Sequence, residues 1–208
     1  MGAQIFKSPT SNSHHALTFL LPAVLLLITI TNMQTTVATS SSSQTYKTYV
    51  KTACNSTTYP LICYKSLSSY ASKIKSNPRK LCIYALSVTL TASKNASSVV
   101  SKQSKKAGLT PTEKVVINDC LENIKESIDE LKDSLTSMKN LGVTGGDVQA
   151  QLDDIKTWVS AVLTDDATCT DEFDDVKVST AIKTAIKNSI VTAARLASNA
   201  LSLIDKLS

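Results

Sequence analysis

Hydrophobic residues recur every three or four positions over most of the chain after residue 40, the spacing that places them on one face of an α-helix. The longest such series begins at Ile117 and ends at Met138. Thr110 precedes it at the N-cap position, Pro111 takes the first helical position and Glu113 the third, which is the capping-box arrangement. Gly142 follows its end, as glycine often follows a helix. The pattern predicts a helix over residues 111–140.

The same spacing predicts three more long helices. One follows "TGGD", with Asp147 at the positive end of the helix dipole, and another fills the last thirty residues. A third is opened by Pro78 and closed by Gly108, and the connections between all four are short. Such connections favour antiparallel neighbours. We therefore expect an all-α, up-down-up-down four-helix bundle over residues 78–208, with almost no strand and with Trp158 as a core residue rather than a ligand platform.

Residues 41–77 are too few for another long helix and suit a short helical hairpin around the ring "CNSTTYPLIC". A hairpin of this size buries little apolar surface. Closing a loop of about ten residues removes roughly 2.7 kcal/mol of unfolded-chain entropy in the simple chain model. A bond between Cys54 and Cys63 would therefore staple a weak element.

An apolar run, "ALTFLLPAVLLLITI", occupies residues 16–30 and is followed by small residues. At about 15 residues it is short for a membrane-spanning helix, which needs roughly 20, and it is typical of a secretory signal peptide. We expect residues 1–40 to be removed by a cut near Ala38, the alternative being an uncut anchor. The mature chain, residues 41–208, is then extracellular and not bound to a membrane.

The composition of the mature chain argues against catalysis. Both histidines, His14 and His15, fall in the predicted signal peptide, so imidazole is absent as a base or a metal ligand. Ser-His and Cys-His nucleophile pairs and histidine zinc sites are thereby excluded. The glycines form no phosphate-binding loop. We expect no enzyme activity and no cofactor.

Five cysteines in an oxidising compartment imply two disulfides and one thiol. Spacing alone leaves every pairing open, although the Cys54–Cys63 ring is the easiest to close. The rival hypothesis, a metal site, lacks the C-x-x-C spacing that it would need.

Four segments together resemble the plant invertase and pectin methylesterase inhibitors, in particular the pectin methylesterase inhibitor branch. They are "CNSTTYPLIC", "INDCLENIKESIDEL", "DVQAQLDDIKTWVSAVLTDDATCTDEF" and "SNALSLIDKL", and the resemblance extends over roughly residues 45–207. The resemblance implies a four-helix bundle preceded by a disulfide-pinned helical hairpin. It also implies that Cys54 pairs with Cys63 and Cys120 with Cys169, which leaves Cys82 as the thiol. Cys82 shares a helical face with apolar residues, so a packing role is favoured over a redox role.

Two N-x-[ST] sequences follow the signal peptide and are candidate glycosylation sites. Asn95 points away from Leu86 on its helix and can carry a glycan. Asn55 lies inside the small ring, where there is less room.

Charge is strongly segregated along the chain. Residues 41–114 contain twelve Lys or Arg and one acid, residues 115–175 contain four lysines and fifteen acids, and residues 176–208 contain five bases and one acid. An electrically two-sided bundle would orient charged partners as they approach; the alternative is that each helix merely has a solvated face.

The acidic tract near residue 170 has no glycine for a calcium-binding loop. Secretion makes nucleic acid an unsuitable partner for the basic half, and anionic wall pectin is the expected incidental contact.

The resemblance implies a secreted protein of the plant cell wall that binds pectin methylesterase reversibly and one to one, over its substrate cleft. We expect the docking face on the second and third long helices, around Thr168, Asp153 and Asp154. A contact through the N-terminal part of the bundle, or mere solvation of these acids, is the alternative.

Two other functions stay open. Inhibitors of acid invertase often carry a Pro-Lys-Phe element, which this chain lacks, since its prolines precede Thr10, Ala23, Leu61, Arg79 and Thr112. A non-inhibitory secreted protein that binds pectin or lipid is the other alternative.

Overall fold

The computed structural model describes residue 2, residues 42–143 and residues 145–207. The chain divides into two units, Met1–Gln44 and Thr45–Ser208, of which the second contains the fold described below. The predicted signal peptide, apart from Gly2, lies outside the described residues. None of the helices in the described part is both long enough and apolar enough to span a membrane.

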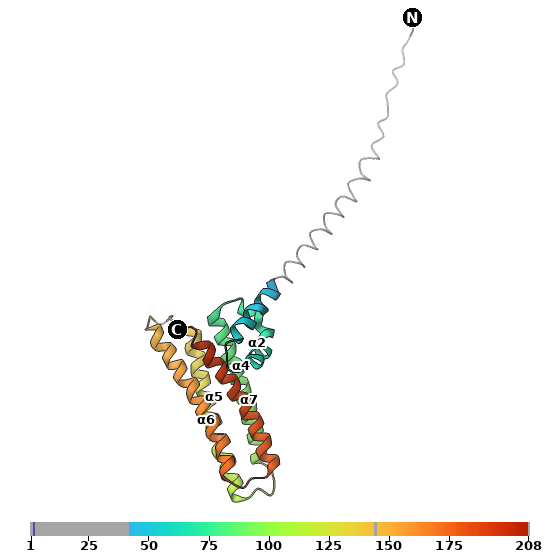
Figure 1. The fold of residues 1–208 in the computed structure, drawn as a ribbon, viewed down its shortest axis with the longest axis vertical. Coiled ribbons are helices and arrows are strands. Elements are labelled where there is room, and N and C mark those ends of the chain that lie inside the picture. Colours follow the sequence, from blue (N-terminus) through green and yellow to red (C-terminus); the bar gives the residue numbers. More distant parts are fainter. Residues whose placement is uncertain (1, 3–41, 144, 208) are drawn as a thin grey trace. The chain divides into compact units, whose positions relative to one another are not determined.

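Four long helices form a bundle in the second unit (Figure 1). They are α4 (Pro78–Ser104), α5 (Pro111–Asn140), α6 (Val148–Asp175) and α7 (Thr180–Ile204). Each helix packs against the next in the chain, and α7 returns to pack against α4. The described ranges contain helices and no strand. The predicted up-down-up-down four-helix bundle is therefore confirmed.

The start of α5 is held by the predicted capping box. The Glu113 backbone N–H donates to Thr110 Oγ1 at 3.2 Å, and the Thr110 backbone N–H donates to Glu113 Oε2 at 3.0 Å. Glu113 Oε1 accepts a further bond from the Ser179 backbone N–H at 2.9 Å. One carboxylate therefore caps α5 and fastens the start of α7 to it.

At the opposite end of the bundle, an arginine fastens α4 to α5. Arg79 Nε donates to the Met138 carbonyl oxygen at 2.9 Å, and Arg79 Nη2 donates to that of Lys139. These carbonyls belong to the last turn of α5, where the helix itself provides no donors. The guanidinium thus neutralises the negative end of the α5 dipole.

The hairpin is more divided than the two predicted short helices. Residues 45–54 are helical, but the second arm consists of α2 (Pro60–Leu67), the 3₁₀ turn η1 (Ser68–Tyr70) and α3 (Ala71–Ile74). Serines lie where this arm is interrupted, at positions 66, 68 and 69. Ser66 Oγ donates to the Cys63 carbonyl oxygen at 2.9 Å. Such local bonds compete with the helical pattern, which explains the interruption.

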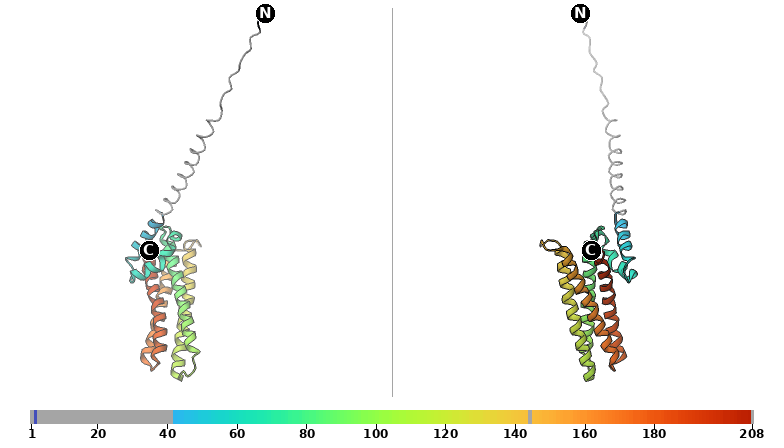
Figure 2. Two further views of the ribbon diagram at one scale, coloured as in Figure 1. Left: turned by 90° about the vertical axis from the view of Figure 1, so that its right-hand side faces the viewer. Right: turned by 60° about the vertical axis from the view of Figure 1, so that its left-hand side comes forward.

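The hairpin ring is attached to α7 by a buried amide. Asn199 Oδ1 accepts from the Tyr59 backbone N–H at 2.8 Å, and Asn199 Nδ2 donates to the Tyr59 carbonyl oxygen at 3.0 Å. Arg195 lies over the Tyr59 ring, 5.5 Å from its centroid. In both views of Figure 2 the hairpin lies at one end of the bundle, beside α4 and α7.

The core has two clusters along the bundle. The first joins the hairpin to the adjacent halves of the long helices and includes Leu67, Ile74 and Leu86. The second fills the far end, around Phe173 and Ile186. Trp158 is partly buried and packs against the first cluster, as expected for a core residue.

Candidate functional site

The best candidate for a functional surface is the outer side of α5 and α6. A disulfide joins these helices between Cys120 and Cys169, whose Cα atoms are 4.4 Å apart, and both cysteines are fully buried. A second disulfide joins Cys54 and Cys63. The structure therefore has the two bonds that the family resemblance implies. The Cys120–Cys169 bond holds α5 and α6 together, so that they form one surface.

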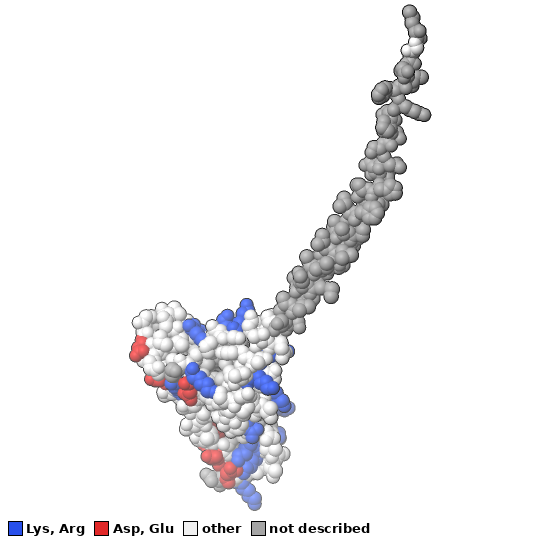
Figure 3. All heavy atoms as spheres, turned by 45° about the horizontal axis from the view of Figure 1, so that its top comes forward, with Lys and Arg blue, Asp and Glu red and all other residues white. Residues whose placement is uncertain are grey.

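Exposed carboxylates cover the solvent side of this helix pair. Spaced at about 100° per residue, the five on α5 fall in one arc, roughly opposite its buried side chains. Figure 3 shows acidic side chains gathered along one edge of the described body. We call this surface the acidic face; its exposed acids are Asp119, Glu122, Glu126, Asp129, Asp133, Asp153, Asp154, Asp171 and Asp174.

Only part of the acidic face is neutralised within the protein. Asp129 pairs with Lys132 at 2.7 Å, and Asp174 pairs with two lysines of α7. These bonds hold the pKa of Asp174 at about 2. Glu122 and Glu126 form no ion pair with any described residue. Negative charge therefore remains available to a partner.

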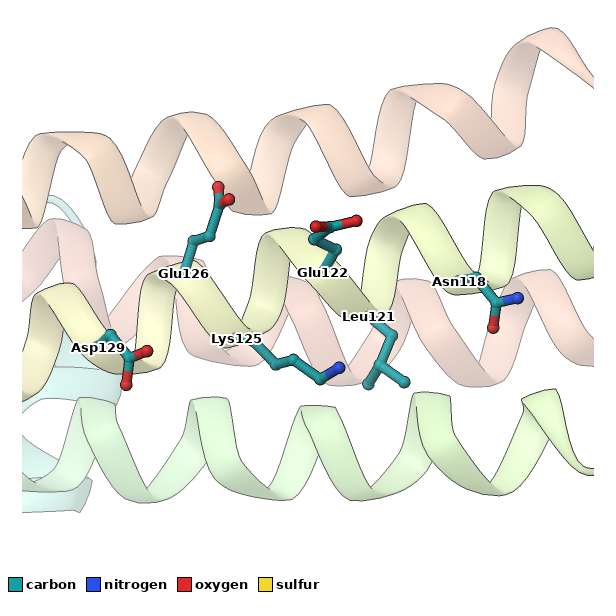
Figure 4. Close-up of a pocket in the computed structure, with 6 residues that line it drawn as sticks. All are labelled: Asn118, Leu121, Glu122, Lys125, Glu126 and Asp129. Carbon is teal, nitrogen blue, oxygen red and sulfur yellow. The ribbon is translucent and has the colours of Figure 1, made fainter.

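A hollow of about 430 Å³ lies on the exposed side of α5. In Figure 4 the side chains of Glu122 and Glu126 point toward α6, whereas those of Leu121 and Lys125 point toward α4. Asn118 and Asp129 complete the lining. An open hollow with several carboxylates and one ammonium group suits a basic side chain of another protein better than a small organic ligand.

Beneath the acidic face, three more carboxyl groups lie in the seam between α5 and α6. Asp166 is only 2 % exposed, and its Oδ2 has no hydrogen-bond partner among the described residues. Asp165 accepts from Ser127 Oγ at 3.1 Å, and its carboxyl group lies near enough to Glu130 to raise the pKa of Glu130. Burial, together with the nearby charge of Asp165, raises the pKa of both Asp166 and Glu130 to about 7. These three groups form a cluster of carboxyl groups, which we call the buried seam, in which Asp166 and Glu130 have raised pKa values.

The predicted contact residues lie on one side of α6 but not close together. Asp153, Asp154 and Thr168 are all exposed and fall within an arc of about 100°. Fourteen residues separate Asp154 from Thr168, which is about 21 Å along the helix. Thr168 Oγ1 donates to the Thr164 carbonyl oxygen at 2.9 Å, so its oxygen is left as an acceptor. The three residues can touch one large partner but not one small ligand.

The buried seam was not predicted from the sequence, where the acids of this region were considered only as parts of a charged or solvated face. The signal was present: Asp166 comes four residues after Val162 and three before Cys169, both of which are buried. That spacing continues the apolar series of the helix. Periodicity thus places Asp166 inside, whatever its charge suggests.

The remaining predicted residues have clear environments. Cys82 is a buried free thiol. Burial raises its pKa to about 12, so the thiol stays protonated and unreactive. Asn95 is exposed on α4, and Asn55 is exposed in the ring between the cysteines. Both asparagines are therefore accessible.

Within the described ranges, no group of three or more His, Cys, Asp or Glu is arranged to hold a metal ion. The prominent features are a rigid, disulfide-linked helical scaffold and a charged outer face. These features define a protein that acts by binding another macromolecule.

Comparison with known proteins identifies the family. Residues 48–203 match the family "Plant invertase/pectin methylesterase inhibitor", and the chain belongs to it. The chain is 46 % identical over 165 residues to pectinesterase inhibitor 10 of Arabidopsis thaliana, covering 79 % of this chain and 52 % of that protein. It is 41 % identical to pectinesterase inhibitor 4 of the same plant, covering 87 % of this chain and 92 % of that protein.

A solved structure supports the same fold. The crystal structure of a mutant form of a pectin methylesterase inhibitor from Arabidopsis matches with a TM-score of 0.58, covering 73 % of this chain and 92 % of that one. Its sequence is 18 % identical, so this match bears on the fold alone. The family consists of proteinaceous inhibitors, in agreement with the prediction that the chain is not an enzyme.

Proposed function

We propose that this protein inhibits a pectin methylesterase reversibly, by docking one to one over the substrate cleft of the enzyme. The support is membership of the inhibitor family and the identity of 46 % and 41 % with two pectinesterase inhibitors. The observation that carries the mode of action is the acidic face, a rigid and exposed surface that offers charge but no catalytic group. Inhibition then consists of excluding the polymer from the cleft.

The acidic face would meet a basic surface on the enzyme. The hollow between Glu122 and Lys125 would take a basic side chain of the enzyme, and Thr168, Asp153 and Asp154 would contact the enzyme along α6. The disulfide between α5 and α6 supports this role because it keeps the two helices from separating. A preorganised surface loses little conformational entropy on binding, which favours affinity.

We also propose that the protein acts outside the cell, in the plant cell wall. Residues 1–40 would serve as a signal peptide. Asn95 would be the main site of N-linked glycosylation, and Asn55 would be a second, less occupied site. Two disulfides fit an oxidising compartment. Mass spectrometry of protein secreted by plant cells would show a start near residue 39 and glycans at these positions; an unprocessed N-terminus would contradict secretion by this route.

A side-by-side titration tests the inhibitory function. Purified protein is added in increasing amounts to a plant pectin methylesterase, assayed by the methanol that it releases, and to an acid invertase, assayed by the glucose that it releases. We expect loss of methylesterase activity that saturates at a one-to-one ratio and reverses on dilution, with the invertase unaffected. Inhibition of the invertase alone would replace this proposal by the invertase alternative, and inhibition of neither would favour a non-inhibitory role.

A further inference from the structure

A second charged surface lies on α4 and at the hairpin end of the bundle. Residues 42–112 contain eleven Lys or Arg and no acid. Arg79 is occupied by carbonyl oxygens of α5. The other ten are exposed lysines at positions Lys47, Lys51, Lys65, Lys73, Lys75, Lys80, Lys94, Lys102, Lys105 and Lys106. Figure 3 shows basic side chains spread over much of the visible surface, some of them beside acidic ones.

Three of these lysines form a row on the solvent side of α4. At about 100° per residue, Lys80, Lys94 and Lys102 fall within an arc of roughly 80°. The row extends over 22 residues, which is about 33 Å of helix. The buried residues of α4 lie on the opposite side of the helix. We call this surface the lysine row.

The lysine row has no acidic partner within the described residues. The ion pairs of the structure use Lys132, Lys156, Lys183 and Lys187, all of which lie on α5, α6 or α7. Helix α4 packs against α5 and α7, so α6 is its diagonal neighbour in the bundle. Uncompensated charge of one sign repels itself and attracts anions from solution. The row is therefore suited to an extended anionic partner.

Small hydroxyl side chains fill the positions between the lysines. Ser87 Oγ and Thr91 Oγ1 each donate to a backbone carbonyl of their own helix, at 2.7 Å and 2.9 Å. Their oxygens remain free to accept hydrogen bonds from a ligand. A surface of single cations alternating with hydroxyl acceptors is complementary to a chain of sugars that carry both carboxylates and hydroxyl groups.

We propose that the lysine row binds a linear polyuronate, the carboxylate-bearing polymer that remains when pectin loses its methyl esters. The choice of this polymer rests on the proposed function, whereas the anionic character of the partner rests on the charge of α4 alone. Methyl-esterified pectin lacks the charge and binds weakly. The protein is thereby held on the polymer where the esterase has already acted, with the acidic face on other helices left for the enzyme.

Binding of polygalacturonate to purified protein tests the proposal. The protein is prepared from a plant host and measured with its N-glycans in place and again after their removal, because Asn95 neighbours Lys94 and the comparison shows whether a glycan there weakens binding to the row. Affinity is measured by calorimetry for polygalacturonate and for highly methyl-esterified pectin, at low and at high salt. We expect binding of polygalacturonate that weakens with salt and little binding of the esterified polymer.

A matched pair of variants locates the site. Lys80→Gln, Lys94→Gln and Lys102→Gln are combined in one protein, and Lys132→Gln, Lys156→Gln and Lys183→Gln in the control, so that both lose three positive charges. We expect the first variant to bind polygalacturonate about tenfold more weakly and the control to change by less than about twofold. Circular dichroism confirms that both remain helical.

Three results would overturn the proposal: no binding of polygalacturonate, equal weakening in both variants, or binding only to vesicles that contain phosphatidylserine. The third would assign the row to a membrane surface instead. Inhibition of pectin methylesterase is measured on the same samples with a short soluble substrate. Loss of polymer binding with full inhibition, or the reverse, separates failure of this proposal from failure of the inhibitory function.

Discussion

Asp166 and Glu113 are acids in opposite situations, and each controls stability in its own direction. The carboxyl group of Asp166 is buried and has an oxygen without a partner, so the folded protein favours its protonated form. The carboxylate of Glu113 accepts bonds from the backbone of Ser179 and from Thr110, and these bonds lower its pKa. Burial without partners disfavours charge, and hydrogen bonding to the charged form favours it.

We predict that the protein becomes less stable as the pH rises from about 4, the ordinary pKa of an aspartate, to about 7, the pKa of Asp166 in the fold. The folded state binds this proton more tightly than the unfolded state, so the stabilisation is complete below the lower value and is lost as the pH passes the higher one. Asp166→Asn removes the ionisation and should be more stable than the parent at pH 8, by a few kcal/mol.

Thermal unfolding at several pH values measures this effect. Asp154→Asn serves as the control: it removes an exposed carboxyl group from the same helix and should not stabilise the protein at pH 8. An Asp166→Asn profile parallel to that of the parent would show that Asp166 is already ionised in the folded protein.

For Glu113 we predict the opposite dependence. Its lowered pKa means that stability is present above the ordinary pKa of a glutamate and is lost as the pH falls through the folded value. Glu113→Gln should lower the thermal midpoint by a few degrees at neutral pH, since the amide replaces a charged acceptor by a neutral one at both the Thr110 and the Ser179 bonds. Glu122→Gln, on the exposed side of the same helix, should change it little.

At the scale of elements, the hairpin is the least self-sufficient part of the fold. It consists of short helices held by the Cys54–Cys63 disulfide and by the bonds of Asn199 to Tyr59. The long helices have their own caps and two apolar clusters. Elements with few internal contacts open locally before the whole molecule unfolds.

We predict that replacing Cys54 and Cys63 together by alanine loosens residues 45–76 and leaves the bundle helical. Removing the bond restores roughly 2.7 kcal/mol of chain entropy to the unfolded hairpin, and Asn199→Ala should act in the same direction by releasing the ring from α7. Hydrogen exchange measures the protection of each segment. An equal loss of protection in α5 and α6 would show that the hairpin and the bundle unfold as one unit.

The elements that could be predicted from the sequence are those with strong local signals. The capping box at Thr110 and the long apolar series after it placed α5 at its observed bounds, because both depend only on neighbours in the chain. The interruption of the second hairpin arm depends on competing local bonds of similar strength and was not predicted. The hydrogen bond from the Ser179 N–H to Glu113 joins residues 66 positions apart. The hydrophobic periodicity of a sequence cannot predict such a long-range contact.

The same contrast holds for the candidate site. The exposure of Asp153, Asp154 and Thr168 follows from their position opposite the buried residues of α6. Their spread along the helix also follows from spacing, so a compact contact point around Thr168 could have been excluded. The closeness of Glu130 on α5 to Asp165 on α6 depends on how the two helices are rotated against each other, which only the folded arrangement determines.

At the scale of the whole molecule, the two charged surfaces belong to different helices. The acidic face lies on α5 and α6, and the lysine row lies on α4. Long-range fields of opposite sign on one small body orient it as it approaches a charged partner. In the proposed complex the acidic face turns toward a basic enzyme, so electrostatic attraction would accelerate association more than it would slow dissociation.

This arrangement predicts how salt and substitution act on the inhibitor–enzyme complex. Added salt should slow association with pectin methylesterase more than it speeds dissociation, because screening acts on the approach over distances of about 10 Å. Replacing Asp153 and Asp154 together by asparagine should slow association by roughly two- to fivefold. The fold should persist, since both side chains are exposed, although Asp153 loses its pair with Lys156. Asp205→Asn, which removes an exposed acid beyond the end of α7 and outside the acidic face, should leave the rate nearly unchanged.

Binding kinetics on immobilised enzyme at low and high salt measure both rates. An association rate that responds neither to salt nor to the double substitution would exclude the acidic face as the steering surface and would direct attention to the side of the bundle that carries α4 and the hairpin.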